Sequence, residues 1–160
     1  MYSWFGNIFD LSEYRGLDAT AYLENVFSED AGAIRWLDET IEGQPVVLEA
    51  NGDSYSDYER VSAMTGLPTV LGWYVHEWLW RGDPADLNVR AEDVKQMYTS
   101  TDTNEVLRLL EQYHVTYIFV GSKEKEKYGD ALNELLLQSI GDIVYQDTAS
   151  GTYILQVQDT

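Results

Sequence analysis

The sequence predicts a single layered α/β domain, in which helices flank a partly parallel, mixed sheet that ends in a β-hairpin. Three observations support this prediction. The chain has 160 residues, a length that suits one hydrophobic core. Strand-like and helix-like patterns alternate along it, an order typical of parallel strands joined by helices. No internal repeat, low-complexity tract or linker divides it, so we assign residues 1–16 to an irregular lead-in and residues 17–160 to the domain.

The first half of the domain is predicted to place helices around a short buried strand. Residues 46–50 are rich in β-branched side chains and are followed by Asn51-Gly52, as in a strand that ends in a tight turn. Ser28 suits the N-cap of the preceding helix, and Gly43 suits its end. The elements expected here are a helix over 18–26, a helix from Ser28 to Gly43, a strand over 46–50, a helix over 58–65 that stops at Gly66, and a strand over 69–72.

The second half is predicted to follow a polar loop around Pro84. Asp102, with Glu105 three residues later, resembles a capping box and marks a helix start. Residues 116–121 form the clearest strand pattern in the chain. The expected elements are helices over 91–98 and 102–113, a strand over 116–121, a charged helical turn over 123–127, a helix carrying Leu132, Leu135 and Leu136, and hairpin strands over 143–146 and 153–157.

The composition is strongly acidic and limits the partners of the chain. It has 28 acidic against 10 basic residues, which gives a formal net charge of −18. Phosphate backbones are bound by Lys and Arg that displace counterions, so we expect no nucleic-acid partner. Such acidity is typical of a highly soluble surface, or of adaptation to a saline medium. Cysteine is absent, which excludes disulfides, thiol catalysis and Cys-based zinc sites.

The familiar catalytic and metal motifs are incomplete in this sequence. His76-Glu77 begins like a zinc-protease motif, but Trp80 stands where the second histidine is required. The turn at 52–56 resembles a nucleophile elbow, but Ser56 replaces its last glycine. The acids near this turn lack the spacing of a calcium loop. We therefore predict no catalytic residue, no metal and no cofactor in this chain.

Residues 49–82 gather aromatic and charged side chains, including three of the five tryptophans. Indoles suit amphipathic ligands, and carboxylates or guanidinium groups fix hydroxyls or phosphates through charge-assisted hydrogen bonds. Glu49 and Asp53 fall at the carboxyl end of a predicted strand, where open α/β sheets commonly bind ligands. The candidate ligand-binding residues are Glu49, Asp53, Tyr55, Tyr58, Arg60, Trp73, His76, Glu77, Trp80 and Arg81.

These candidate residues have two opposite interpretations. In a ligand site, the carboxylates accept hydrogen bonds from hydroxyls, the guanidinium groups meet phosphate and the indoles stack. In a purely structural role, Trp73 and Trp78 fill the core, while Arg60 and Arg81 pair with nearby acids. The two interpretations differ in whether the side chains converge on one hollow that solvent can reach.

The same segment carries a resemblance to a known family. It contains the run EAxGDSYxxYxRVSxxTGxPTVLGWxxHExxWRG, which is similar to the C-terminal region of the YYY membrane proteins of bacteria and archaea. These are multi-pass proteins regarded as relatives of the GT-C glycosyltransferases, which use lipid-linked sugars. Weaker likeness spans 17–157, through the segments 17–22, 33–37, 113–121 and 127–129. His114 departs from the pattern, because glycine is expected after that helix.

The resemblance implies an extracytoplasmic domain of a protein of the cell membrane, with the membrane-embedded remainder of the same polypeptide as its partner. The acidic catalytic motif of GT-C enzymes lies between membrane helices, and this sequence has no apolar stretch of the roughly 20 residues that span a bilayer. The domain is then expected to hold a lipid-linked sugar or its acceptor without supplying the catalytic acid. By analogy, residues 73–77 are a partial counterpart of the Trp-Trp-Asp segment that holds the acceptor in oligosaccharyltransferases.

Two other functions stay open as alternatives. The aromatic side chains of residues 49–82 can serve as anchors that dock the domain onto the membrane portion, which predicts an exposed apolar patch instead of a pocket. The chain can also be an independent hydrolase that uses Ser54. That alternative requires the hydroxyl of Ser54 within hydrogen-bond reach of His76 or His114.

Overall fold

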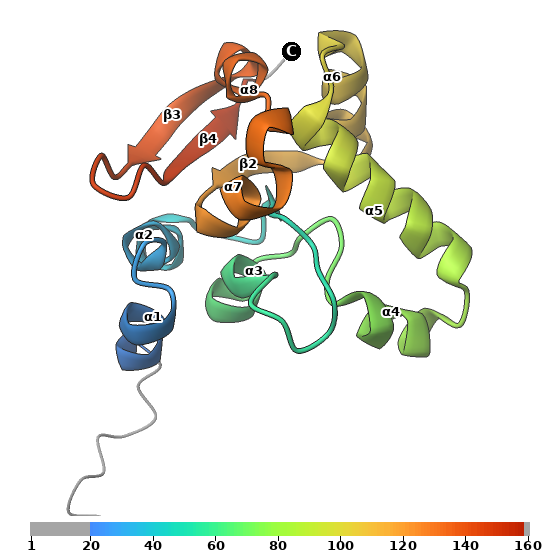
Figure 1. The fold of residues 1–160 in the computed structure, drawn as a ribbon, viewed down its shortest axis with the longest axis horizontal. Coiled ribbons are helices and arrows are strands. Elements are labelled where there is room, and N and C mark those ends of the chain that lie inside the picture. Colours follow the sequence, from blue (N-terminus) through green and yellow to red (C-terminus); the bar gives the residue numbers. More distant parts are fainter. Residues whose placement is uncertain (1–19, 159–160) are drawn as a thin grey trace, which may run out of the picture.

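The computed structural model describes residues 20–158, and Figure 1 shows a sheet with helices packed around it. The predicted lead-in over 1–16 lies outside the described residues. In chain order the elements are α1 (Thr20–Val26), α2 (Ala31–Thr40), β1 (Val46–Leu48), α3 (Arg60–Thr65), α4 (Tyr74–Arg81), α5 (Pro84–Thr99), α6 (Thr103–Gln112), β2 (Val115–Val120), α7 (Ser122–Tyr128), the 3-10 helix η1 (Gly129–Ala131), α8 (Glu134–Ile140), β3 (Gly141–Gln146) and β4 (Tyr153–Val157).

The strands of the described chain form one mixed sheet in the order β1-β2-β4-β3. β1 and β2 run parallel, with Val47 opposite Tyr117. β4 is antiparallel to both of its neighbours, and β3 and β4 form the hairpin at the end of the chain, drawn in orange and red in Figure 1. The predicted fold class, a mixed sheet with helices around it and a terminal hairpin, is therefore confirmed.

Different helices cover the two faces of the sheet. Successive residues of a strand point to opposite faces. In β2, Ile118 belongs to the core that includes residues of α5, α6 and α8, whereas Phe119 belongs to the core that includes residues of α1, α2 and α3. In β4, Leu155 belongs to the first of these cores and Ile154 to the second. The side chains of all four strand residues are buried. The domain is thus a three-layer α/β/α arrangement.

The region between α3 and α6 differs most from the prediction. Residues 69–72 do not form a strand, since Thr69 makes only an isolated parallel bridge with Val47. Helix α4 has no counterpart among the predicted elements. Helix α5 begins at Pro84, where a loop is predicted, because the Asp83 side chain caps it by accepting from the Ala85 N–H at 2.8 Å. Proline is well suited to the first helical position, where its missing N–H has no intrahelical partner to lose.

The other helix ends show which sequence signals are reliable. Asp102 accepts from the N–H groups of Asn104 at 3.0 Å and Glu105 at 3.4 Å, so the predicted cap of α6 is confirmed. The predicted start of α2 at Ser28 is wrong. Asp30 occupies the N-cap position there and makes no side-chain cap bond, because its carboxylate accepts hydrogen bonds from Arg60 and Ser122 instead. None of the described helices combines the length and the apolar character required to cross a bilayer.

Candidate functional site

The parallel pairing of β1 and β2 brings the segments that follow these strands together at one end of the sheet. The hydroxyl of Tyr98, from α5, lies 3.0 Å from the carbonyl oxygen of Leu48 and 2.7 Å from that of Phe119, and so joins the two strand ends. Beyond this point the loop 49–59 meets α7, where the Ala50 N–H donates to Glu124 Oε1 at 2.9 Å. The predicted site segment therefore starts at the carboxyl end of a parallel strand pair, as expected.

A buried ionic cluster of Arg60, Asp30 and Glu124 lies beneath this loop. Arg60 Nε is 2.7 Å from Asp30 Oδ2, its Nη2 is 2.8 Å from Glu124 Oε2, and none of the three side chains exposes any surface. Burial alone would raise the pKa of Asp30, but Arg60 and hydrogen bonds from Ser122 hold that pKa below its usual value. Arg60 is thus paired with internal acids, as the structural interpretation predicts, and has no exposed surface for a phosphate.

Two further buried carboxylates fix the backbone around the loop. Glu49 accepts from the N–H groups of Val61 and Ser62, both at 2.8 Å, and so caps the first turn of α3. Glu59 accepts from the Gly52 N–H at 2.6 Å, while its Oε2 has no hydrogen-bond partner in the described part of the chain. Burial raises the pKa of Glu49 to about 7 and that of Glu59 to about 8. Glu49 and Arg60, two of the predicted ligand-binding residues, are therefore buried and out of reach of solvent.

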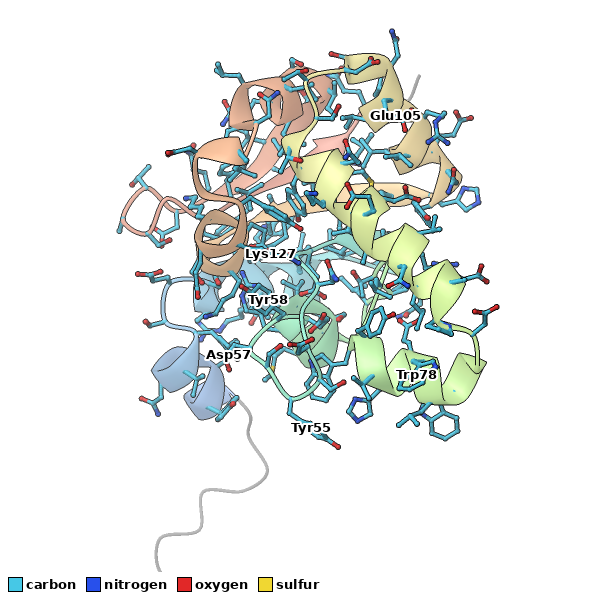
Figure 2. All side chains as sticks on the ribbon, turned by 45° about the vertical axis from the view of Figure 1, so that its right-hand side comes forward. Tyr55, Asp57, Tyr58, Trp78, Glu105 and Lys127 are labelled. Atoms are coloured by element: carbon cyan, nitrogen blue, oxygen red, sulfur yellow. The ribbon has the colours of Figure 1, made fainter. Side chains whose placement is uncertain are left out.

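Three ring side chains come together outside this interior, and we term Tyr55, Trp73 and His76 the aromatic cluster. The ring centroids are 5.5 Å apart for Tyr55 and Trp73, 4.9 Å for Tyr55 and His76, and 5.2 Å for Trp73 and His76. Tyr55 is 81% exposed, and Figure 2 shows its side chain projecting from the loop away from the rest of the domain. Its φ of 61° lies in the left-handed region that a non-glycine residue seldom adopts, and such strained residues gather at functional sites.

An open pocket of about 320 Å³ is formed where the loop meets α4 and α7, and we term it the Lys127 pocket. Its lining residues are Asn51, Gly52, Asp53, Tyr58, Tyr74 and Lys127. Lys127 Nζ donates to the carbonyl oxygen of Asn51 and, at 3.0 Å, to its Oδ1. The Tyr74 hydroxyl donates to Asn88 Oδ1 at 2.9 Å. Aromatic rings, a carboxylate, an amide and an ammonium group thus face one hollow.

Tyr58 is held firmly within this pocket. The ammonium groups of Lys123 and Lys127 lie 5.9 and 5.5 Å from the centre of its ring, and Figure 2 shows Lys127 beside it. A Cβ atom at Gly52 would lie 2.3 Å from Tyr58 Cδ2, so only glycine allows the loop to approach the ring this closely. The indole N–H of Trp73 donates to the Tyr58 carbonyl oxygen at 3.3 Å and so joins the aromatic cluster to the pocket wall.

Helix α4 carries the remaining candidate residues. Trp73, His76 and Trp80 recur at spacings of three and four residues, which places them along one side of the helix. Trp80 is 88% exposed and extends this side one turn beyond His76. Glu77 Oε1 accepts from the Gly72 N–H at 2.6 Å, so this carboxylate binds the turn that precedes the helix. The side chain of Arg81 lies outside the described part of the structure.

Helix α4 exposes four large apolar side chains, Val75, Trp78, Leu79 and Trp80, and we term them the α4 patch. Leu79 is 72% exposed and Trp78 is 43% exposed. The interpretation in which Trp78 fills the core is therefore wrong. An exposed group of two indoles and two aliphatic side chains is a feature of interaction surfaces.

The hydrogen bond between Ser54 and His76 bears on the hydrolase alternative. His76 Nδ1 lies 3.0 Å from Ser54 Oγ, which meets the distance that this alternative requires. His114 lies at the other end of β2, beside Val115, and lines a separate pocket of about 460 Å³. A serine nucleophile also needs a group that orients the imidazole, and among the described residues Ser54 is the hydrogen-bond partner found for this ring. One hydroxyl–imidazole contact does not make a catalytic site.

Sequence reasoning missed Asn51, Tyr74 and Lys127 as members of the site. Lys127 lies 76 positions after Asn51, and no local motif connects the two residues. A signal was nevertheless present. When two predicted strands are parallel, the residues that follow each of them meet at the same end of the sheet, so the short helix after β2 belongs beside the loop after β1.

The fold is similar to that of a solved domain. The C-terminal globular domain of an oligosaccharyltransferase from Archaeoglobus fulgidus (AfAglB-S2) superposes with a TM-score of 0.50 and 13% sequence identity. The match covers 81% of this chain and 97% of that domain. At this identity the similarity establishes the fold alone. No protein-family model matches the sequence, and no curated protein matches it.

Proposed function

We propose that this chain is the soluble, extracytoplasmic domain of a multi-pass membrane protein of the YYY type, which resembles the GT-C glycosyltransferases. In this proposal the domain binds the acceptor or the lipid-linked donor and does not supply the catalytic acid. The membrane-embedded remainder of the same polypeptide is its partner, and the parent protein resides in the cell membrane. Support comes from the sequence run at 49–82 and from a fold that is similar to the C-terminal globular domain of an oligosaccharyltransferase.

The observation that carries the proposal is the joining of the aromatic cluster to the Lys127 pocket. Both features are built from the same two segments. In the loop after β1, Asp53 lines the pocket and Tyr55 belongs to the cluster. At the start of α4, Tyr74 lines the pocket and Trp73 belongs to the cluster. Concave sites that combine ring faces with a few polar groups are the usual form of small-molecule sites. This arrangement supports ligand binding over a purely structural role for the segment.

Each of the groups that solvent reaches, fully or in part, has a defined part in this binding. Trp73 and Tyr55 present ring faces on which a sugar or an acceptor side chain can stack. Asp53 accepts hydrogen bonds from hydroxyl groups, and Lys127 donates to them. Glu49 and Arg60 act from the interior, where they hold α3 and the loop in place.

A calorimetric titration of the chain with a short-chain polyprenyl-phosphate sugar tests the proposal. We expect Trp73→Ala to weaken binding about tenfold, because the loss of a stacked indole removes roughly 1–2 kcal/mol. Trp78→Ala is the matched control, since Trp78 is an exposed indole of the α4 patch that belongs neither to the aromatic cluster nor to the Lys127 pocket. Equal binding by Trp73→Ala and the unaltered chain, across donor and acceptor compounds alike, would refute the proposal.

A second candidate function is docking of the domain onto the membrane-embedded part of the polypeptide. The exposure of Leu79 and of the neighbouring indoles of the α4 patch favours it. We expect Leu79→Glu to abolish co-purification of the domain with a separately expressed membrane portion. Val89→Glu is the control, because Val89 is also exposed but lies on α5. If both variants co-purify equally well, the α4 patch is not the docking surface.

A further inference from the structure

We infer that the Lys127 pocket takes an uncharged sugar ring and not a phosphate group. This inference rests on the proposed function and names the part of a lipid-linked sugar, or of a glycosylated acceptor, that this domain holds. It separates two chemical groups that the sequence alone assigns to one site: the hydroxyls of the sugar and the phosphate of its carrier.

The charge around the pocket argues against phosphate. Lys127 is the ammonium group that lines it, and two of its three N–H bonds are directed to Asn51. Partial burial lowers the pKa of Lys127, and the nearby carboxylates of Glu59, Glu124 and Asp53 partly oppose this effect. Asp53 and Glu124 lie near enough to Lys127 to offset part of its charge, so a further anion gains little from this cation. The net charge of −18 adds a repulsive field around the whole molecule.

The guanidinium group that would suit a phosphate is occupied. Phosphate recognition in proteins commonly uses the paired N–H groups of arginine. Among the arginines whose side chains the structure describes, Arg60 is the one next to this loop. It directs Nε to Asp30, Nη2 to Glu124 at 2.8 Å and Nη1 to Glu124 at 3.3 Å. Its release would leave buried carboxylates unpaired, which is strongly unfavourable. No phosphate at the pocket can therefore use it.

The remaining groups match the surface of a sugar. Tyr58 and Tyr74 give the pocket two aromatic rings, and Tyr58 is immobilised by its packing against Gly52. A sugar ring has apolar C–H faces that lie against such rings and hydroxyls at its edge. Asp53 accepts from those hydroxyls, and the third N–H of Lys127 donates to them. The volume of about 320 Å³ suits a single ring, at the lower end of ligand pockets.

Saturation-transfer NMR on the full 160-residue chain tests the inference with defined probes. The neutral probes are methyl α-D-mannopyranoside, methyl β-D-glucopyranoside and the methyl glycoside of N-acetylglucosamine. The charged probes are the methyl glycoside of glucuronic acid and inorganic pyrophosphate. We expect at least one neutral glycoside to bind, glucuronide to bind about fivefold more weakly than its neutral counterpart, and pyrophosphate not to displace the bound glycoside.

Substitutions locate the binding. Asp53→Asn and Lys127→Met should each weaken the glycoside about fivefold, since Asp53→Asn replaces a charged acceptor with a weaker neutral one and Lys127→Met removes a donor. Asp53 is exposed, so Asp53→Asn tests the site even if Lys127→Met perturbs the loop. Lys95→Met is the control, because Lys95 is an exposed lysine on α5 that pairs with Glu92.

The outcomes separate this inference from the proposed function. Pyrophosphate binding that exceeds glycoside binding and is lost in Lys127→Met would overturn the inference directly. If no glycoside binds but the polyprenyl-phosphate sugar still binds through Trp73, the inference fails and the proposed function stands. If neither class of compound binds, both fail.

Discussion

Arg60 and Glu124 are 64 positions apart in the sequence, yet their side chains form two hydrogen bonds in the interior, the shorter at 2.8 Å. Glu124 also accepts from the N–H groups of Ala50 and Gly121, both at 2.9 Å. One carboxylate therefore connects the residues that follow β1, the residues that follow β2 and helix α3. This connection fixes the position of the candidate site, because Ala50 leads directly into the loop that lines the Lys127 pocket.

Glu124→Gln is expected to destabilise the domain by about 3 kcal/mol, because the amide NH2 group cannot accept the hydrogen bonds that one carboxylate oxygen takes from Arg60 and from a buried backbone N–H. Urea denaturation measures this difference. The control is Arg108→Gln, which breaks the exposed pair of Arg108 with Glu105 on α6, far from the site in Figure 2. It should leave stability unchanged within error. Equal effects of the two substitutions would show that the buried cluster does not support the fold.

Glu59 is expected to make the domain less stable as pH rises from about 5 to about 8. Burial raises its pKa from the usual 4.5 to about 8, so in this window the folded chain binds more protons than the unfolded chain, and unfolding becomes more favourable as pH increases. Glu49, with a pKa raised to about 7, acts in the same direction. Glu59→Gln removes one of these titrations and should reduce the slope, by at most about 1.4 kcal/mol per pH unit.

Urea midpoints at about pH 5 and about pH 8 provide the measurement for Glu59→Gln. The amide can still accept from the Gly52 N–H, which keeps the loop contact. Glu105→Gln, at an exposed position, should retain the original pH dependence and serves as the control. A slope for Glu59→Gln that equals that of the unaltered chain would mean that this carboxyl is ionised throughout.

His114→Gly is expected to stabilise the domain by about 1 kcal/mol. His114 follows α6 with a φ of 53°, in the left-handed region where a Cβ atom is strained and glycine is not. His114→Ala removes the same imidazole but keeps the Cβ atom, so it should show no such gain. Thermal unfolding of the two variants side by side isolates the backbone contribution, and a gain shared by both would assign the effect to the side chain instead.

Gly52→Ala is expected to destabilise the loop and to weaken ligand binding at the Lys127 pocket. The added methyl group would overlap the ring of Tyr58, and such overpacking typically costs about 1–3 kcal/mol. Denaturation and glycoside titration report the two effects. Because the clash involves one ring, Gly52→Ala combined with Tyr58→Ala should recover stability relative to the sum of the single changes. Simple additivity in that double-mutant cycle would place the cause elsewhere.

The layered architecture could be predicted from sequence because its signals are local. The β-branched run at 115–120, the cap at Asp102 and the glycine-containing turn at 149–151 each act over a few residues. Helix α4 could not be predicted in this way. Its stretch of Tyr, Val and Trp side chains is compatible with a strand as well as a helix, and its exposed indoles give no clear apolar stripe toward the core.

The location of the candidate site could be predicted from the sequence, but the full set of residues that form it could not. The carboxyl end of the first strand was a sound expectation for its location, and Asp53, Tyr55, Tyr58, Trp73 and His76 do gather there. The sequence does not distinguish Arg60 and Glu49, which are buried, from charged residues that are exposed and can bind a ligand. Their burial depends on partners 30 and 64 positions from Arg60 and on the N-terminus of α3, which only the tertiary fold reveals.

β4 is the last strand in the described chain, yet it occupies an inner position in the sheet, between β2 and β3. A growing polypeptide can therefore not complete the sheet until residues 153–157 have left the ribosome. Before that moment β2 has a free edge on which foreign strands can add, a hazard for any partly synthesised chain. Pairing of β2 along both of its edges consequently waits for β4.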